Sequence, residues 1–475
     1  MRGRPGLIPG RCALLALLSA GLLSAAHDER WVRVRSPHFE LFTEGSEAGG
    51  RELVSFFEQV HGFFQQAFGL NGRGRVVRIV CFRSPKEFQH YESSKIADAA
   101  FHAGASHDYI LMKEGAAGRD PMAVHEYTHL IVRATNHDIP VWLDEGLAEL
   151  YSNMEAHGNF VVVGRVIEAR AAALAEGRWI DLRSLVSANR GSAVYTKHAQ
   201  AEMFYAESWA LVHMLALDNG YSPRLRAFMD ALQHEDSVHA FQQTYGKPIE
   251  SVEADLRAYL QSDRLNAAVF PVRLPPARAE LQVTPRAGLE ARLALASMLL
   301  DYPGRTAESR AAFEQAVRDY PRRPEAEQGM AEYLAHERRE PEAIEHFARA
   351  VDLGSADANL YLEYGRALAL ANRTGDALTI LWKSVGLAPA LDAAHYELAV
   401  LLVKTGAFAE ALDQFHAVRR LPPAEAPRYY YNLAYAHFQL GQLDQARALV
   451  ERARRVTRNP DEVERLDRLL KDVSR

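Results

Sequence analysis

The C-terminal part of the chain repeats itself with a period of 34 residues. Large apolar residues recur at this spacing, and so do two sets of small ones. The large set is Phe313, Phe347, Leu381 and Phe415, and the small sets are Ser297, Ala331, Gly365 and Ala399, and Ala343, Ala377 and Ala411. A period held this strictly restricts the region to a stack of equivalent units, each of which buries one face against the next.

Within each unit the sequence indicates two helices joined by a turn, such as "KTGAFAEAL" or "QLGQLDQAR". One inserted residue shifts the last unit to Ala434 and Ala446. The period and its small residues resemble tetratricopeptide repeats. We therefore expect about five repeats over residues 286–459, forming an all-α solenoid, with residues 460–475 as a C-terminal capping helix. A generic helical bundle would not keep a fixed period.

The first 26 residues differ from the rest of the chain. Arg2, Arg4 and Arg11 precede the apolar run "CALLALLSAGLLSAA", which ends at Ala26. The small residues Ser24 and Ala26 stand at the end of this run, before the charged "HDER". The pattern predicts a signal peptide over residues 1–26, and hence an exported protein that is periplasmic or secreted. The run is shorter than the roughly 20 residues of a membrane-spanning helix, so an uncleaved membrane anchor is the less favoured alternative.

Charge and cysteine content limit the partners and the covalent chemistry. The chain has a net charge of −6, which becomes −9 once the three arginines of the predicted signal peptide are removed. This mild acidity gives no reason to expect nucleic acid or an anionic membrane as a partner. Only Cys81 lies outside the signal peptide, so the mature chain forms no internal disulfide.

Residues 27–265 read as one α+β domain. Strand patterns occur in "RWVRVRSPHFELFTE", "RVVRIVCF" and "YILMKEG", and "FFEQVHGFFQQAF" has helical spacing. From Pro121 onward the pattern is mainly helical, with one strand-like stretch at "NFVVVGRVI". Residues 266–285 contain four prolines and no helical period, so we expect a proline-rich linker there.

The stretch "HEYTH" at residues 125–129 has the spacing of a metal site. On a helix, residues four apart lie on the same face, so His125 and His129 can present both imidazoles to one ion. Glu126 can then accept a proton from water that the ion activates. This division of roles predicts a hydrolytic Zn²⁺ site, since a buried pair of histidines without a ligand would be costly.

A catalytic zinc ion needs a third protein ligand and leaves its fourth position to water. The metzincin pattern would require glycine and histidine where this chain has Val132 and Thr135, which excludes that class. The remaining candidates are His137, Asp138, Asp144, Glu145 and Glu149.

The continuation "VWLDEGLAELYS" resembles the second motif of the gluzincins, and its WL-x-EG-x-A form is similar to that of aminopeptidase-N-type enzymes. The resemblance implies that Glu145 is the third zinc ligand. It also implies that Glu149, one turn later, supports a zinc-binding histidine through a hydrogen bond. Fifteen residues separate His129 from Glu145, fewer than in the aminopeptidases, so the connecting loop is shortened.

The same resemblance extends to "FYAESWALVHML". It implies that Tyr205, 60 residues after Glu145, stabilises an oxyanion with its hydroxyl. The alternative is that Tyr205 only packs against Trp209, one turn later. The family's motif for a free amine has no match before His125. By analogy with the fold, "YILMKEG" is expected at the sheet edge, where an extended substrate would lie.

Taken together, the motifs are similar to bacterial proteins of the peptidase MA-like kind, in which a short gluzincin core is joined to tetratricopeptide repeats. This implies a zinc-dependent peptidase whose repeats bind a peptide substrate or a partner protein. Two alternatives stay open. One is a repeat scaffold with a zinc-binding but inactive zincin domain, and the other is a hydrolase of non-peptidic substrates on the same core.

Overall fold

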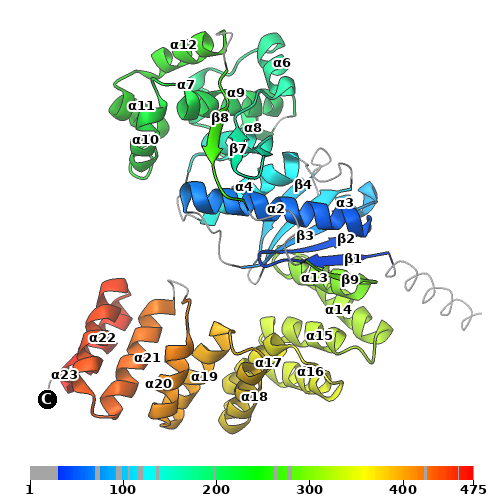
Figure 1. The fold of residues 1–475 in the computed structure, drawn as a ribbon, viewed down its shortest axis with the longest axis vertical. Helices are drawn as coiled ribbons and strands as arrows, with labels where there is room; N and C mark the ends of the chain where they lie inside the picture. The colour runs from blue at the N-terminus through cyan, green and yellow to red at the C-terminus, as the bar shows by residue number, and fades with distance from the viewer. Residues whose placement is uncertain are drawn as a thin grey trace, which may run out of the picture. The chain divides into compact units, whose positions relative to one another are not determined.

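The computed structural model describes residues 30–69, 75–92, 99–104, 107–114, 121–134, 139–196, 198–261, 265–274, 281–421, 425–457 and 459–473. The chain divides into two compact units, Met1–Ala294 and Leu295–Arg475 (Figure 1). No helix in the described part of the chain is long and apolar enough to cross a membrane. The predicted signal peptide lies outside the described residues, so export stays a prediction.

A six-stranded mixed sheet, counted over the described residues, forms the base of the first unit, in the order β4-β5-β3-β2-β1-β9. Strands β2, β3 and β5 are parallel, and the other neighbours are antiparallel. The bounds are β1 (Val32–Arg35), β2 (Phe39–Thr43), β3 (Val77–Phe82), β4 (Ala99–Ala103), β5 (Asp108–Lys113) and β9 (Gln282–Pro285). The predicted small sheet is therefore confirmed.

The edge of this sheet differs from the prediction. The stretch "YILMKEG" forms β5, which lies between β3 and β4 and is not an edge strand. The edge strand next to β5 is β4, with the sequence "AAFHA", and the opposite edge is β9. Three alanines in five residues give weak strand propensity, which is why the pattern did not indicate this strand.

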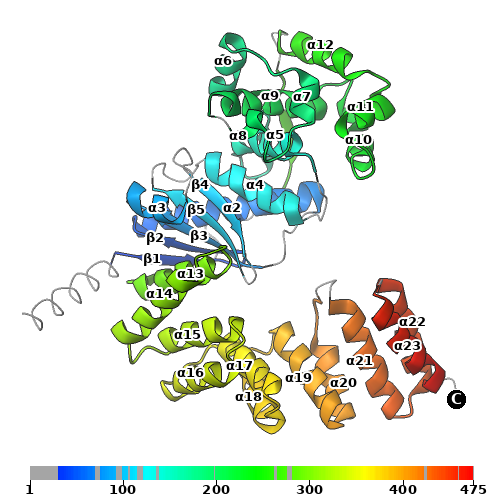
Figure 2. The ribbon, with the colours of Figure 1, turned by 180° about the vertical axis from the view of Figure 1, so that it is seen from behind.

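Two helices share a core with one face of the sheet. Helix α2 (Glu47–Phe68) packs against β1 and β2, and α4 (Pro121–Ala134) packs against β4 and β5 (Figures 1 and 2). Helix α2 begins after Ser46, whose side chain accepts a hydrogen bond from the Gly49 N–H, and ends at Gly69 in the left-handed conformation. The cross-strand row from Val34 to Ile110 faces this core.

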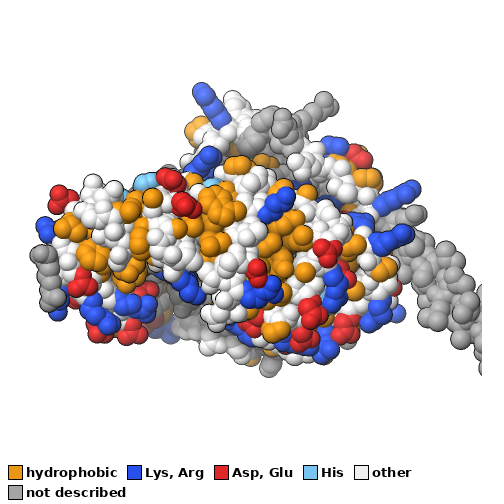
Figure 3. Space-filling view, turned by 90° about the horizontal axis from the view of Figure 1, so that it is seen from below, with side chains coloured by type: hydrophobic (Ala, Val, Ile, Leu, Met, Phe, Trp, Pro, Cys, Tyr) orange, Lys and Arg blue, Asp and Glu red, His pale blue; other side chains and the backbone are white. Residues whose placement is uncertain are grey.

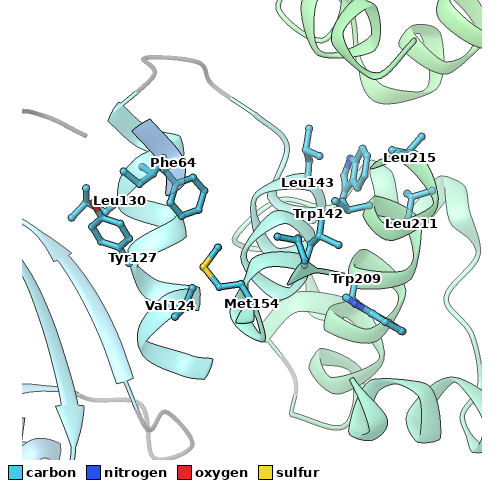
Figure 4. Packing of buried hydrophobic residues seen from close by; sticks show 14 of the residues in the cluster. Phe64, Val124, Tyr127, Leu130, Trp142, Leu143, Met154, Trp209, Leu211 and Leu215 are labelled. Carbon is cyan, nitrogen blue, oxygen red and sulfur yellow. The ribbon is translucent and has the colours of Figure 1, made fainter. Parts of the chain in front are cut away.

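The rest of the first unit is mainly helical. Helix α5 (Val141–Ser152) packs against α4 and against α9 (His198–Leu217). Figure 4 shows this part of the core, with Val124 on α4, Trp142 on α5 and Trp209 on α9. The other helices are α3 (Pro85–Tyr91), α6 (Glu168–Glu176), α7 (Leu182–Val186), α8 (Ala193–Thr196), η1 (Ser222–Arg224), α10 (Leu225–Ala231), α11 (Ser237–Tyr245) and α12 (Ile249–Leu260).

The stretch expected as a linker, residues 266–285, contributes two strands. Strand β8 (Ala268–Pro271) pairs with β7 (Phe160–Val163), which also pairs with β6 (Glu155–Ala156), and β9 pairs with β1. Both β8 and β9 are edge strands, and each ends in a proline. Proline is tolerated at such edges because its missing N–H removes no interior ladder bond. The prolines that indicated a linker are therefore compatible with strand pairing.

Five successive helix pairs, counted over the described residues, follow from α13 (Gly288–Leu300) onward (Figure 1). They confirm the predicted all-helical repeat region, because every large residue of the 34-residue period is at most 2% exposed. Helix α23 (Pro460–Val473) packs Leu466 and Leu469 against the last pair. The other helices are α14 (Thr306–Asp319), α15 (Pro324–His336), α16 (Glu340–Asp352), α17 (Ala358–Leu370), α18 (Thr374–Leu387), α19 (Asp392–Thr405), α20 (Phe408–Ala417), α21 (Ala426–Gln439) and α22 (Leu443–Val456).

Candidate metal centre

Helices α4 and α5 bring His125, His129 and Glu145 to one point. The two Nε2 atoms lie 3.1 Å apart, and Glu145 Oε2 lies 3.3 Å from each of them. All three side chains are buried. Two ligands bound at about 2.0–2.1 Å to a tetrahedral zinc ion are separated by about 3.3 Å. The triangle of donor atoms therefore has the size of one face of a zinc coordination tetrahedron.

The carboxylate of Glu145 fits a bound cation for a second reason. Its Oε2 atom is buried and makes no hydrogen bond of normal geometry within the described part of the chain. Leaving a buried carboxylate oxygen without a partner is costly. A cation held between this oxygen and the two imidazoles would remove that cost. The donor set of two histidines and one carboxylate is also one that zinc accepts in catalytic sites.

Asp144 orients one of the two histidines. Its Oδ1 lies 2.8 Å from Nδ1 of His129, and its Oδ2 accepts a hydrogen bond of 2.9 Å from Arg190. Burial opposes protonation of His129, but Asp144 and Glu145 outweigh it and raise the pKa of His129 to about 10. Without an ion, both ring nitrogens of His129 therefore carry a proton near neutral pH. A bound cation would displace the proton from Nε2, while Nδ1–H stays donated to Asp144. Asp144, one of the candidate ligands, is therefore a supporting residue.

Glu149 lies beside the other histidine but does not support it by a hydrogen bond. Its Oε1 is 3.6 Å from Nδ1 of His125, which is too long. Both carboxylate oxygens instead accept hydrogen bonds from Arg170, at 2.7 and 3.0 Å. The sequence resemblance implied that Glu149 would orient a histidine through a hydrogen bond. In the structure Asp144 makes such a bond instead, to His129.

Glu126 lies at the edge of the sheet. Its carboxylate accepts a hydrogen bond from the backbone N–H of Phe101 in the edge strand β4. Burial raises the pKa of Glu126, while the nearby His125 and His129 act to lower it. Helix α4 therefore holds a carboxylate with a raised pKa next to the two candidate ligands.

Two tyrosines complete the surroundings. The ring of Tyr205 stands edge-on to that of His125, with centroids 6.5 Å apart. Its hydroxyl is hydrogen-bonded to Tyr195 of α8, and the Tyr195 hydroxyl donates to Glu145 Oε1 at 2.9 Å. The guanidinium of Arg170 lies 5.3 Å from the centre of the Tyr205 ring. Burial raises the pKa of both tyrosines, so both hydroxyls stay protonated near neutral pH.

Gly146 allows α9 to reach the site. A Cβ atom at this position would lie 2.5 Å from the backbone oxygen of Ser208 and 2.4 Å from a methyl carbon of Val212. Both residues are on α9, the helix that carries Tyr205. The glycine next to Glu145 is therefore needed for close helix packing.

Sequence reasoning found the three candidate ligands but missed Arg170, Arg190 and Tyr195. These residues lie 21 to 50 residues from the acids that they bind. No spacing rule connects them to "HEYTH" or "WLDEGLAEL", so residue type was the only signal for them in the sequence. The remaining ligand candidates, His137 and Asp138, lie outside the described residues.

Comparison with known proteins finds the repeats. Residues 295–358 and 396–462 match the tetratricopeptide repeat family. No curated protein sequence matches the chain at a significant level. Among solved structures, YrrB, a tetratricopeptide-repeat protein with an unusual peptide-binding site, is 20% identical over 37% of this chain and 90% of its own, with a TM-score of 0.33.

Two further solved structures are similar over the same share of the chain. The pilF protein of Pseudomonas aeruginosa is 19% identical over 39% of this chain and 86% of its own, with a TM-score of 0.33. The repeat protein TTC0263 of Thermus thermophilus is 21% identical over 38% and 98%, with a TM-score of 0.29.

Proposed function

We propose that the first unit is a zinc-dependent peptidase and that the repeats bind its protein substrate or a partner protein. The observation that carries the proposal is the convergence of His125, His129 and Glu145 at the mutual distances of zinc ligands. The resemblance of "HEYTH" and "WLDEGLAEL" to the gluzincin motifs supports peptide hydrolysis as the reaction class.

In this proposal each group at the site has a defined task. A bound zinc ion would supply Lewis-acid polarisation and acidify water. Glu126 accepts the proton of the attacking water and passes it to the leaving amine, a role that suits a carboxylate with a raised pKa. Tyr205 turns its hydroxyl from Tyr195 toward the developing oxyanion. Asp144 keeps Nδ1 of His129 protonated, so that Nε2 is the ligand atom.

The chain contains tetratricopeptide repeats, an architecture that presents extended surfaces for protein binding. Large apolar side chains stand exposed on this array, including Leu370 at 60% and Trp382 at 42%. The face seen in Figure 3 carries hydrophobic patches between charges of both signs. These features support a protein or peptide as the ligand of the repeats.

The test is digestion of a peptide library and of an unstructured protein by wild type and by Glu126→Gln. We expect the variant to keep its zinc and to lose at least about 100-fold in rate, because a general base contributes that much. Glu176→Gln, an exposed glutamate on α6, is the matched control and should cleave like wild type. Equal cleavage by Glu126→Gln and wild type would remove the base role of Glu126.

The second candidate is a repeat scaffold whose first unit binds zinc without turnover. It is favoured by the comparisons, which match the repeats alone. The same digestion separates the two candidates. A wild-type protein that binds zinc but cleaves neither the library nor the unstructured protein would support the scaffold. Cleavage that requires Glu126 would exclude it.

A further inference from the structure

One short segment, residues 190–195, contacts both of the consecutive acids on α5. Arg190 donates to Oδ2 of Asp144 at 2.9 Å, and Tyr195 donates to Oε1 of Glu145 at 2.9 Å. Both acids are nearly fully buried, with exposures of 4% and 3%. Each contact therefore reaches a carboxylate that has little access to water. The segment itself is accessible, since the Arg190 side chain is 54% exposed.

The two contacts belong to two separate series of hydrogen bonds, and each series ends at a candidate ligand. One runs from Arg190 to Asp144 and on to Nδ1 of His129. The other runs from Tyr205 through Tyr195 to Oε1 of Glu145.

The Tyr195 contact gives the two carboxylate oxygens of Glu145 different roles. Oε1 accepts the tyrosine hydroxyl, whereas Oε2 faces the two imidazoles and makes no hydrogen bond of normal geometry within the described residues. A carboxylate held in this way offers one oxygen to an ion. Without the hydroxyl, Oε1 loses its partner and becomes available as a second ligand atom, which would raise the coordination number of the site.

We propose that residues 190–195 form a positioning segment for the metal centre. Tyr195 restricts Glu145 to one ligand oxygen and holds Tyr205 beside it, while Arg190 fixes His129 through Asp144. The inference rests on the proposed zinc site and adds to it the residues that set its affinity and coordination number. Neither residue touches the ion or the substrate.

The test compares zinc affinity by chelator competition, and the visible spectrum after replacement of zinc by Co²⁺. We expect Tyr195→Phe and Arg190→Ala each to weaken zinc binding by about 10- to 100-fold, the range for residues that support metal ligands. Only Tyr195→Phe should also weaken the visible Co²⁺ bands, because five-coordinate Co²⁺ absorbs less than tetrahedral Co²⁺.

Two variants serve as matched controls outside the site. Tyr221→Phe also removes a tyrosine hydroxyl from a carboxylate, that of Asp255, and Arg183→Ala removes an equally exposed arginine from Glu250. Both should bind zinc like wild type. Circular dichroism of each metal-free protein checks that it is folded.

The possible outcomes distinguish a failure of the metal centre from a failure of the positioning segment. A folded wild type that binds no zinc overturns the metal centre and this inference together. A wild type that binds zinc, with Tyr195→Phe and Arg190→Ala unchanged in affinity and spectrum, overturns the positioning segment alone. Equal loss in the controls would also overturn it, because the effect would then follow from general loosening of the fold.

Discussion

The two units treat buried polar groups differently. In the repeats two buried serines are paired with backbone oxygens: Ser309 Oγ donates to the Ala296 oxygen and Ser384 Oγ to the Ala358 oxygen, both at 2.7 Å. In the first unit three buried acids, Asp144, Glu145 and Glu149, lie together on α5, and Glu145 Oε2 stays without a normal hydrogen bond in the described residues. The serine hydrogen bonds stabilise helix packing, whereas an unpaired carboxylate oxygen that faces two imidazoles is suited to a bound cation.

Glycines at helix crossings show the same contrast. A Cβ at Gly146 would meet the Ser208 backbone oxygen at 2.5 Å, which cannot move without shifting α9. A Cβ at Gly365 would meet the Leu381 side chain at 2.6 Å, whereas the nearest backbone atom, the Ala377 oxygen, lies at an ordinary contact distance of 3.6 Å. The repeat can adjust because a side chain can rotate, and two equivalent repeat positions carry alanine already, at residues 331 and 399.

A pair of glycine substitutions tests this contrast directly. We expect Gly146→Ala to destabilise the first unit by about 1–3 kcal/mol, the usual cost of overpacking, and to displace Tyr205 with α9. Gly365→Ala should cost less than about 1 kcal/mol. Hydrogen exchange read by mass spectrometry reports each unit separately. If Gly365→Ala lowered the stability of the repeats as much as Gly146→Ala lowers that of the first unit, the proposed difference between the two glycines would be wrong.

A pH-dependent effect is expected from Glu207 of α9, which is 1% exposed. Its Oε1 accepts the Ile180 N–H at 2.7 Å, and burial raises its pKa to about 8. The unfolded chain releases this proton above about pH 4.5, whereas the folded chain keeps it until about pH 8. Stability of the first unit should therefore fall as pH rises between these values.

Glu207→Gln imitates the protonated acid and should remove this dependence. We expect the variant to be more stable than wild type by up to about 4 kcal/mol at pH 8 and nearly equal to it at pH 4.5. Denaturant unfolding at both pH values measures the difference. An identical pH dependence in variant and wild type would show that Glu207 is ionised in the folded protein.

The sequence predicted the repeats more completely than the site. Residues equivalent to Phe347 and Ala343 recur every 34 residues, so each repeat gives independent evidence for the same structure. "HEYTH" indicated two candidate ligands because helical spacing brings His125 and His129 to one face. Glu145 was implied by the resemblance of "WLDEGLAEL" to the gluzincin motif. Arg190 and Tyr195 were not predictable, because tertiary contacts between distant segments leave no local pattern.

The assignment of roles between Asp144 and Glu149 also needed the structure. Both are acids on α5 close to the histidines, and the sequence resemblance favoured Glu149. Which carboxylate bonds a histidine depends on where the arginines lie. Arg170 occupies both oxygens of Glu149, whereas Arg190 leaves Oδ1 of Asp144 for His129.

The zinc content of the purified protein tests the central claim most directly. Elemental analysis should find about one zinc ion per wild-type chain, and far less in His129→Ala and Glu145→Ala. Arg183→Ala, which lies outside the site, should keep the wild-type content. A folded wild-type protein that takes up no zinc when it is supplied, or a Glu145→Ala variant that holds as much zinc as wild type, would contradict the account.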